Sequence, residues 1–471
     1  MMGVFWITTF FYALLLFVPS KAVALVVSIL FLGVLFVVFR NIPSVLVLGY
    51  LAFVPLPVGK FFPIPLVSAA QLQFLLGRPF GISADILVTP QELLVIVMAI
   101  MLVWRMAQTG HMFWPDTYVG WTLVVLPIAF VASAMFGSML PGVSTLHALF
   151  YLAPFILYTF ITRIRHRLDY RAVLGIVLAG ILLEGTVLLA QLANGGALGL
   201  IVERNPYYTP IDVSTEATNL LRLGGTFPHA NNLAQFLLFA IPVTLPMLFA
   251  PGASMSPWVV VPFFVGWTTF MLTQSRSAWL ALGVALVWCV AHARRFRIRL
   301  VVHRPLRRVG WVVLGALLVV AVLVGYPRAA STLRTMEPYG SGATRLLLLR
   351  EAGALIREYP VFGVGIPLDV YASYLRSQAL GKELVSYFPE PVHNGFLELV
   401  VQTGIVGLVP YVLVLIGLWQ ALFFRRAMES QSRKLYRMGV AAALLGQMVN
   451  AQLQPLLPDL STLVLLITLL T

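Results

Sequence analysis

The chain has 471 residues, of which 60% are hydrophobic and only 10% are Asp, Glu, Lys or Arg. Soluble domains are about 45–50% apolar and about 25% charged, so this composition excludes a water-soluble fold and indicates that a bilayer is the solvent. The formal net charge is +14, and its meaning depends on where the cations lie relative to the membrane.

Apolar runs long enough to cross about 30 Å of hydrocarbon recur along the whole chain. They predict an all-α, polytopic integral membrane protein with about 12–14 transmembrane helices and a large helical periplasmic loop. The first run has no basic leader and no small-residue cleavage site, which favours a spanning helix over a removable signal. The expected spans lie near residues 4–19, 22–39, 43–58, 92–107, 118–137, 144–162, 171–193, 231–249, 257–273, 277–293, 310–326, 395–423, 437–452 and 458–470.

The Lys and Arg residues concentrate in alternate connections between these spans. With a cytoplasmic N-terminus, the cytoplasmic connections hold 18 Lys and Arg against three acids, and the rest of the chain holds 13 cations and 14 acids. Short basic loops stay in the cytoplasm, so both termini are predicted to be cytoplasmic. We interpret the basic runs as topology signals in contact with anionic membrane lipids, and no motif for nucleic acid is present.

Long connections on the opposite face divide the chain. The third and largest contains a stretch over residues 344–360 that predicts a helix ended by Pro360 and lying on the outer membrane surface. The apolar face of this helix is expected to hold Leu346, Leu349, Gly353 and Ile356. The water-facing side is expected to hold Arg350, Arg357 and Glu358. The predicted organisation is N-terminal transmembrane helices (1–194), central transmembrane helices with periplasmic arginine motifs (195–325), a large periplasmic loop (326–392) and C-terminal transmembrane helices (393–471).

Three arginines and a histidine lie near span ends on the outer face, where topology does not require cations. They are Arg222 before a span, Arg276 in a tight turn with Gln274 and Ser275, Arg345 at the start of the loop helix, and His393 at the start of another span. A guanidinium group binds phosphate oxygens in a bidentate manner, and an imidazole accepts protons near neutral pH. The set favours transfer chemistry at a phosphate-bearing leaving group. The alternatives are membrane-interface anchors for the arginines and a helix cap for His393.

Two further polar residues, Glu184 and His229, and the lack of cofactor motifs also bear on function. Glu184 lies within a span, where an ionisable residue indicates either function or a hydrogen-bonded structural role. His229 is interpreted as a loop residue rather than a ligand contact. The sequence has no metal-ligand cluster, P-loop or dinucleotide-binding glycine motif, so neither a metal nor a nucleotide cofactor is expected.

Four segments resemble one known family, the O-antigen ligase and polymerase superfamily. They are Pro391-Val-His-Asn-Gly-Phe-Leu-Glu-Leu399 with Gln402-Thr-Gly-Ile-Val-Gly407; Gln274-Ser-Arg-Ser-Ala-Trp-Leu-Ala281; Arg222 with Gly225-Thr-Phe-Pro228 and Asn232-Leu-Ala234; and Gly342-Ala-Thr-Arg345 with Tyr359-Pro-Val-Phe-Gly-Val-Gly365. The matches keep the family's order from about residue 220 to 410, and the first 200 residues match only as a row of spans. Many relatives have an acidic residue where this chain has Gln402, so a charge role there is not carried over.

The resemblance implies a metal-independent, inverting membrane glycosyltransferase of the GT-C type in the bacterial inner membrane. Such enzymes move a glycan from undecaprenyl pyrophosphate to an acceptor hydroxyl on the periplasmic face. The acceptor is the lipid A core of lipopolysaccharide for a ligase and a lipid-linked glycan for a polymerase. Carried onto this chain, His393, Arg276 and Arg222 would be catalytic, whereas Arg345, Asn394, Gln274 and Ser275 would bind substrate. Helix capping remains an equal alternative for Asn394.

The ligase is the first hypothesis and the polymerase the second. The alternative from another class is a flippase or transporter for the same lipid-linked oligosaccharide. A carrier is expected to place charged residues at the membrane midplane between two repeated halves. Only Glu184 lies deep in a predicted span, which favours the transferase.

Overall fold

The computed structural model describes residues 1–18, 20–56, 60–63, 85–164, 168, 170–204, 222–245, 257–292, 341–379, 391–423, 430–455 and 459–470. Within them, six helices or helical runs are long and apolar enough to cross a membrane. They are α2 (Lys21–Phe39), α5 (Pro90–Thr109), α6 (Tyr118–Phe136), the run of α7 (Pro141–Leu149), η1 (Phe150–Leu152) and α8 (Ala153–Arg163), α9 (Tyr170–Asn194) and α17 (Gly395–Phe423). The protein is therefore a polytopic, helical membrane protein, as predicted.

Further helices complete the bundle. They are α1 (Met2–Leu16), α3 (Ile42–Phe53), α10 (Ala230–Thr244), α11 (Pro257–Leu272), α12 (Arg276–His292), α18 (Gln431–Ala451) and α19 (Leu460–Leu470). Every predicted span except one coincides with a helix or helical run, with ends that differ by a few residues. The exception, 310–326, lies outside the described residues.

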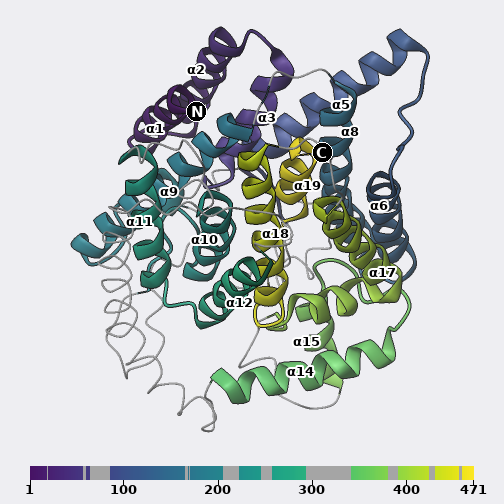
Figure 1. Ribbon diagram of the computed structural model, residues 1–471. Helices are drawn as coiled ribbons and strands as arrows, with labels where there is room; N and C mark the ends of the chain where they lie inside the picture. Colours follow the sequence, from purple (N-terminus) through teal and green to yellow (C-terminus); the bar gives the residue numbers. More distant parts are fainter. Residues whose placement is uncertain are drawn as a thin grey trace.

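The helices pack side by side in a bundle (Figure 1), and they differ in how far their side chains are buried. Most residues of α9 are buried, and α1 and α11 pack against it. In contrast, α2 exposes apolar side chains such as Val26 and Leu30. Lipid tails solvate apolar side chains, so such exposure is expected for a helix at the edge of a membrane bundle. Elsewhere in the bundle, α10 and α12 pack against α18, and α17 packs against α6.

The predicted loop helix is confirmed as α14 (Ser341–Glu358), which lies across one end of the bundle (Figure 1). Arg350 and Arg357 are exposed, as expected. On the face that packs against the protein, Leu348, Ala352 and Leu355 are buried, and Ile356 from the expected apolar face is partly buried against the same cluster. Leu346 and Leu349 from the expected apolar face are instead 49% and 39% exposed. These leucines point away from the bundle because the three packed residues occupy the side of α14 that faces it.

A second helix, α15 (Asp369–Ala379), follows α14 and was not predicted. Arg376 joins the two, with Nη1 2.9 Å from Glu351 Oε2 and Nε 2.8 Å from Glu358 Oε1. These two carboxylates raise the pKa of Arg376 further. Also unpredicted is an antiparallel pair of short strands, β1 (Lys60–Pro63) and β2 (Asp85–Val88), within the first long connection.

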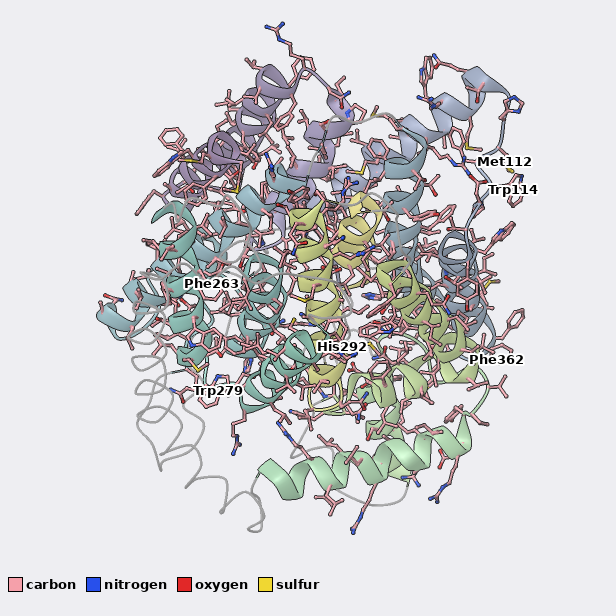
Figure 2. All side chains as sticks on the ribbon, viewed as in Figure 1. Met112, Trp114, Phe263, Trp279, His292 and Phe362 are labelled. Atoms are coloured by element: carbon pink, nitrogen blue, oxygen red, sulfur yellow. The ribbon has the colours of Figure 1, made fainter. Side chains whose placement is uncertain are left out.

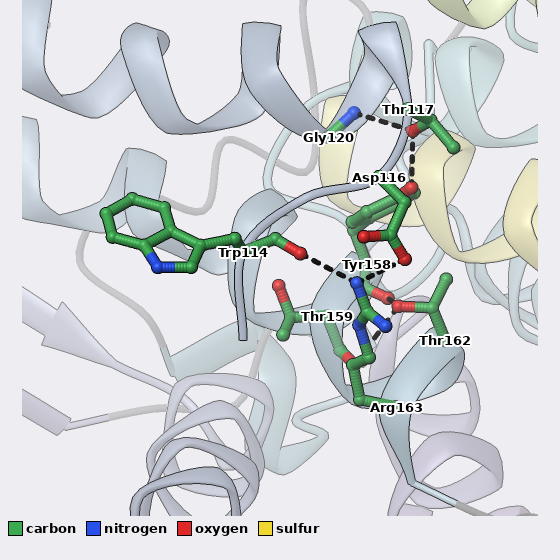
Figure 3. A network of polar contacts seen from close by, with 8 residues as sticks. All are labelled: Trp114, Asp116, Thr117, Gly120, Tyr158, Thr159, Thr162 and Arg163. Atoms are coloured by element: carbon green, nitrogen blue, oxygen red, sulfur yellow. Dashed lines mark hydrogen bonds and ion pairs between the residues drawn. The ribbon is translucent and has the colours of Figure 1, made fainter. Parts of the chain in front are cut away.

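Polar contacts join two connections that were predicted to be cytoplasmic (Figure 3). At the end of α8, Arg163 Nη2 donates to the Trp114 carbonyl at 2.6 Å and to Asp116 Oδ2 at 2.5 Å. Nearby, the hydroxyls of Thr117 and Tyr158 are 2.5 Å apart. Trp114 and Met112 lie in the upper half of Figure 2, whereas Trp279 and Phe362 lie in its lower half, where α14 is. The two connections therefore share one end of the bundle, as the charge pattern predicts.

The helix α17 is broken at Gly404, whose φ is 61° and ψ −162°. A break leaves backbone groups without helical partners, and these must be satisfied inside a membrane. Residues 360–365 supply the partners: Val364 N donates to Val401 O at 2.9 Å, and Ile405 N donates to Pro360 O at 3.0 Å. A Cβ on Gly404 would collide with the carbonyl of Val361. Two segments that resemble separate family signatures thus form one structural unit.

Candidate functional site

Arg222, just before α10, connects two of the predicted motif segments. Its Nη2 donates to Asn231 Oδ1 at 2.9 Å, and its Nε donates to the carbonyl of Thr273 at 3.4 Å. Thr273 begins the turn after α11, and Asn231 lies in the first turn of α10. The half-buried guanidinium therefore lies between the start of α10 and the turn that carries Arg276.

That turn has an unusual backbone. Gln274 is buried and adopts a positive φ of 53°, which few residues other than glycine adopt without a compensating role. Ser275 is also buried, and its hydroxyl is 3.3 Å from that of Ser277. Arg276 is the first residue of α12 and is exposed. A cation at a helix N-terminus opposes the helix dipole, so the position costs stability and creates a strongly positive spot that favours an anion.

A third segment, at the end of α18, meets both of these motifs. Gln454 accepts a hydrogen bond from Asn231 Nδ2 at 3.1 Å and donates from Nε2 to Ser277 Oγ at 3.0 Å. Its carbonyl accepts from Gly395 N, at the start of α17, at 2.9 Å. Sequence reasoning missed Gln454. Its signal was a row of polar residues, Asn450, Gln452 and Gln454, at the end of an otherwise apolar run.

His393 lies two residues before Gly395, just outside the membrane-spanning part of α17. Burial lowers the pKa of His393 to about 4, helped by electrostatic interactions with Arg345 and His229, while a hydrogen bond to the Pro391 backbone opposes the shift. The ring is therefore neutral at pH 7, the form that accepts a proton. The electrostatic effect of Arg345 on this ring indicates that the first turns of α14 lie near His393.

Asn394 and His229 both act as helix caps. Asn394 Oδ1 accepts from Leu397 N at 3.0 Å in the first turn of α17, and its Nδ2 donates to the Gln452 carbonyl at 3.1 Å. His229 caps α10 by accepting from Asn231 N on Nδ1 at 3.0 Å. These contacts support the capping interpretation of Asn394 and the loop interpretation of His229.

Glu184, buried in α9, holds the loop that carries Arg222. Its two carboxylate oxygens accept from the Thr226 hydroxyl at 2.6 Å and from Thr226 N at 3.0 Å. The neighbouring Gly225 has a φ of 64°, and a Cβ there would collide with Glu184. Gln191, also on α9, donates to the Gly225 carbonyl at 2.8 Å and accepts from its N–H at 3.1 Å. These contacts support the structural role for Glu184.

A second polar cluster, also missed, surrounds Gln402. Gln402 Nε2 donates to Asp369 Oδ1 at 2.8 Å and to Glu398 Oε1 at 3.1 Å. Burial raises the pKa of Asp369, at the start of α15, although the bond from Gln402 partly offsets this. A neutral amide is well suited to this position because it donates to two carboxylates at once. The departure from an acidic residue at 402 therefore has a local structural explanation.

The described contacts thus link Arg222, the turn at 273–277 and the start of α17, and they place Arg345 within electrostatic range of His393. We call Arg222, Arg276, Arg345 and His393 the arginine–histidine cluster. Among the residues that the structure describes, no three His, Cys, Asp or Glu side chains are grouped to hold a metal ion. The arrangement offers fixed positive charge beside a neutral imidazole.

A comparison with protein families gives one match. The family model described as O-antigen ligase (Wzy_C) matches residues 261–412, a stretch that includes Arg276, Arg345 and His393 and begins after Arg222. No curated protein matches the chain. Residues 261–412 are therefore similar to the O-antigen ligase domain family, which includes ligases and polymerases that act on lipid-linked glycans.

Proposed function

We propose that the protein is an O-antigen ligase-like glycosyltransferase. It moves a glycan from undecaprenyl pyrophosphate to a hydroxyl of the lipid A core oligosaccharide at the periplasmic face, without a metal and with inversion. The observation that carries the proposal is the chain of contacts from Arg222 through Asn231 and Gln454 to Ser277 and Gly395. It links three segments that resemble family signatures although they are far apart in the sequence.

In the proposed reaction, the acceptor oxygen attacks the anomeric carbon as the bond from that carbon to the pyrophosphate oxygen breaks. The electron pair leaves with undecaprenyl pyrophosphate, so negative charge grows on the diphosphate. Arg222 and Arg276 stabilise this charge, because positive groups fixed in advance are most effective where charge develops. Arg276 acts together with the positive end of the α12 helix dipole, and Gln274, Ser275, Arg345 and Asn394 are the proposed substrate contacts.

His393 orients the acceptor hydroxyl and takes its proton. The low pKa, about 4, keeps the imidazole neutral before substrate binds. A bound diphosphate brings negative charge close to the ring and raises this pKa, which makes His393 a stronger base when the donor is in place. The basicity of His393 is therefore higher in the donor complex, where it takes the proton, than in the free enzyme.

The polymerase is the second candidate, because a lipid-linked repeat unit presents the same kind of acceptor hydroxyl. The test incubates purified protein with a lipid-linked glycan and either lipid A core or additional lipid-linked repeat units. We expect glycan-modified lipid A core. A ladder of longer lipid-linked glycans without core modification would replace the ligase by the polymerase. Flipping of the lipid-linked glycan across proteoliposomes without transfer would instead favour the transporter.

We also propose the sidedness and the division of the chain. The protein lies in the bacterial inner membrane with both termini cytoplasmic, and the arginine–histidine cluster faces the periplasm. Residues 1–194 and 393–471 supply transmembrane helices, 195–325 supply the arginine motifs, and 326–392 form the large periplasmic loop. The charge pattern and the shared end of the two connections at Asp116 and Arg163 support this orientation.

A further inference from the structure

A glutamine just after the end of α18 contacts three segments of the proposed site. Gln454 is 5% exposed. Its Oε1 accepts from Asn231 Nδ2 at 3.1 Å, its Nε2 donates to Ser277 Oγ at 3.0 Å, and its carbonyl accepts from Gly395 N at 2.9 Å. A buried amide with partners at both ends of its side chain is geometrically fixed, because losing either partner leaves an unsatisfied polar group.

Each of these three partners is adjacent to a member of the arginine–histidine cluster. Asn231 accepts a hydrogen bond from Arg222 at 2.9 Å. Ser277 directly follows Arg276, and Gly395 is two residues beyond His393. The segments come from the starts of α10, α12 and α17, which have separate positions in the bundle. Their relative placement at this end therefore depends on the contacts that cross between them.

We propose that Gln454 is a positioning residue that sets Arg222, Arg276 and His393 in the geometry required for glycan transfer. The inference rests on the proposed function, because it takes the arginines as the diphosphate site and His393 as the proton acceptor. Gln454 acts through Asn231, Ser277 and the Gly395 backbone. It is not proposed to touch the reacting atoms.

Relative placement matters because transfer with inversion is an in-line displacement. The leaving diphosphate and the attacking hydroxyl lie on opposite sides of the anomeric carbon, so the arginines and the histidine must be correctly spaced. A misplacement of about 1 Å can cost about 100-fold in rate. Loss of Gln454 is expected to disturb both donor binding and turnover, whereas a loss of folded protein lowers only the amount of active enzyme.

The chain offers a matched control within α18. Gln447 lies in that helix, before Gln454 in the chain, and is 4% exposed. It accepts from Gln235 Nε2 at 3.0 Å and donates to the Gln235 carbonyl at 2.8 Å. Replacing Gln447 by Leu thus removes a buried, doubly bonded amide between α18 and α10 without changing the three contacts of Gln454.

The experiment compares Gln454→Leu with Gln447→Leu in the purified full-length protein. Transfer kinetics with a lipid-linked donor are measured alongside binding of undecaprenyl pyrophosphate and thermal stability. We expect Gln454→Leu to raise the donor KM, weaken binding and lower kcat/KM by about 100-fold. Gln447→Leu should lower thermal stability to a similar degree and leave the donor KM within about twofold of wild type. An unchanged donor KM in Gln454→Leu, or an equal rise in both variants, would overturn the inference.

Two further variants separate the positioning role from the proposed function. If Gln454 acts on Arg222 through Asn231, the two substitutions remove the same interaction. The double variant Asn231→Ala with Gln454→Leu should then bind the donor about as tightly as the single variant that binds it least well. Additive losses would contradict this route. Arg222→Ala tests the diphosphate site itself. If Arg222→Ala binds the donor normally, the proposed function is wrong, and the inference that rests on it is wrong too. If Arg222→Ala binds the donor weakly while Gln454→Leu binds it normally, only the inference is wrong.

Discussion

His393 differs from an ordinary surface histidine because its ring is neutral well below pH 6.5. Burial lowers its pKa to about 4, and electrostatic interactions with Arg345 and His229 contribute to the shift. A neutral imidazole is what a proton acceptor requires, but a pKa this low makes a weak base. The negative diphosphate of the donor compensates for this in the proposed mechanism.

The pH dependence of transfer tests this compensation. Protonated His393 cannot accept a proton, so activity should fall as the pH is lowered. In the free enzyme the loss should centre near pH 4, which is the pKa of His393. With donor bound, the diphosphate raises the pKa, so the acidic limb of kcat should lie at higher pH than that of kcat/KM. The measurement is a pair of pH–rate profiles, and coincident limbs would contradict the mechanism.

Single substitutions in the arginine–histidine cluster should abolish most transfer. We expect His393→Ala to lower kcat by about 10²- to 10⁴-fold, the usual contribution of a positioned proton acceptor. Arg276→Ala should lower it by about 10²- to 10³-fold through lost stabilisation of the leaving diphosphate. Arg357→Ala, an exposed arginine on α14, is the control and should retain wild-type kinetics. Full transfer by normally folded His393→Ala and Arg276→Ala would refute the catalytic assignment.

Among the elements, the broken helix α17 makes the strongest demand on sequence. Gly404 has a φ of 61°, and the segment 360–365 fills the break with backbone hydrogen bonds. Gly363, on that segment, has a φ of 68°, and a Cβ there would lie 2.5 Å from the Gln402 carbonyl carbon. The two glycines allow two backbones to approach closely where side chains do not fit.

Gly404→Ala should therefore destabilise the protein. The added Cβ would be strained at this φ and would collide with the Val361 carbonyl, at a cost of about 1–3 kcal/mol. Gly353→Ala is the matched control, because a Cβ in that turn of α14 meets no atom within 4 Å. In a helix interior the control should stabilise by about 0.5–1 kcal/mol. Thermal unfolding in detergent measures both, and equal midpoints would show that the break tolerates a side chain.

For the molecule as a whole, the proposal requires the two ends of the bundle to face different compartments. Cys289 is the chain's single cysteine, so a Cys289→Ala background allows one new cysteine at a time. We expect Arg357→Cys on α14 to react with a membrane-impermeant maleimide in intact spheroplasts. Asp116→Cys, from a side chain that is 71% exposed, should react only after permeabilisation. The reverse pattern would place the arginine–histidine cluster on the cytoplasmic side.

The spans could be predicted from sequence because crossing a bilayer is a local requirement of length and apolarity. The helix predicted over residues 344–360 was found as α14 (Ser341–Glu358), since its periodicity is local too. The exposure of Leu346 and Leu349 was not predicted, because the neighbouring segments decide which side of an amphipathic helix packs. The helix α15 and the strands β1 and β2 were also missed, and these are short elements that tertiary contacts stabilise.

Composition and single segments of sequence were enough to predict the class of the protein, its helical spans, the candidates His393, Arg222 and Arg276, and the family that residues 261–412 match. Three buried polar contacts became visible only in the folded chain: Glu184 holds the Gly225–Thr226 loop, Gln402 bridges two carboxylates, and Gln454 joins three motif segments. The physical reason is that a buried polar side chain is defined by its partners, and those partners come from segments that only folding brings together.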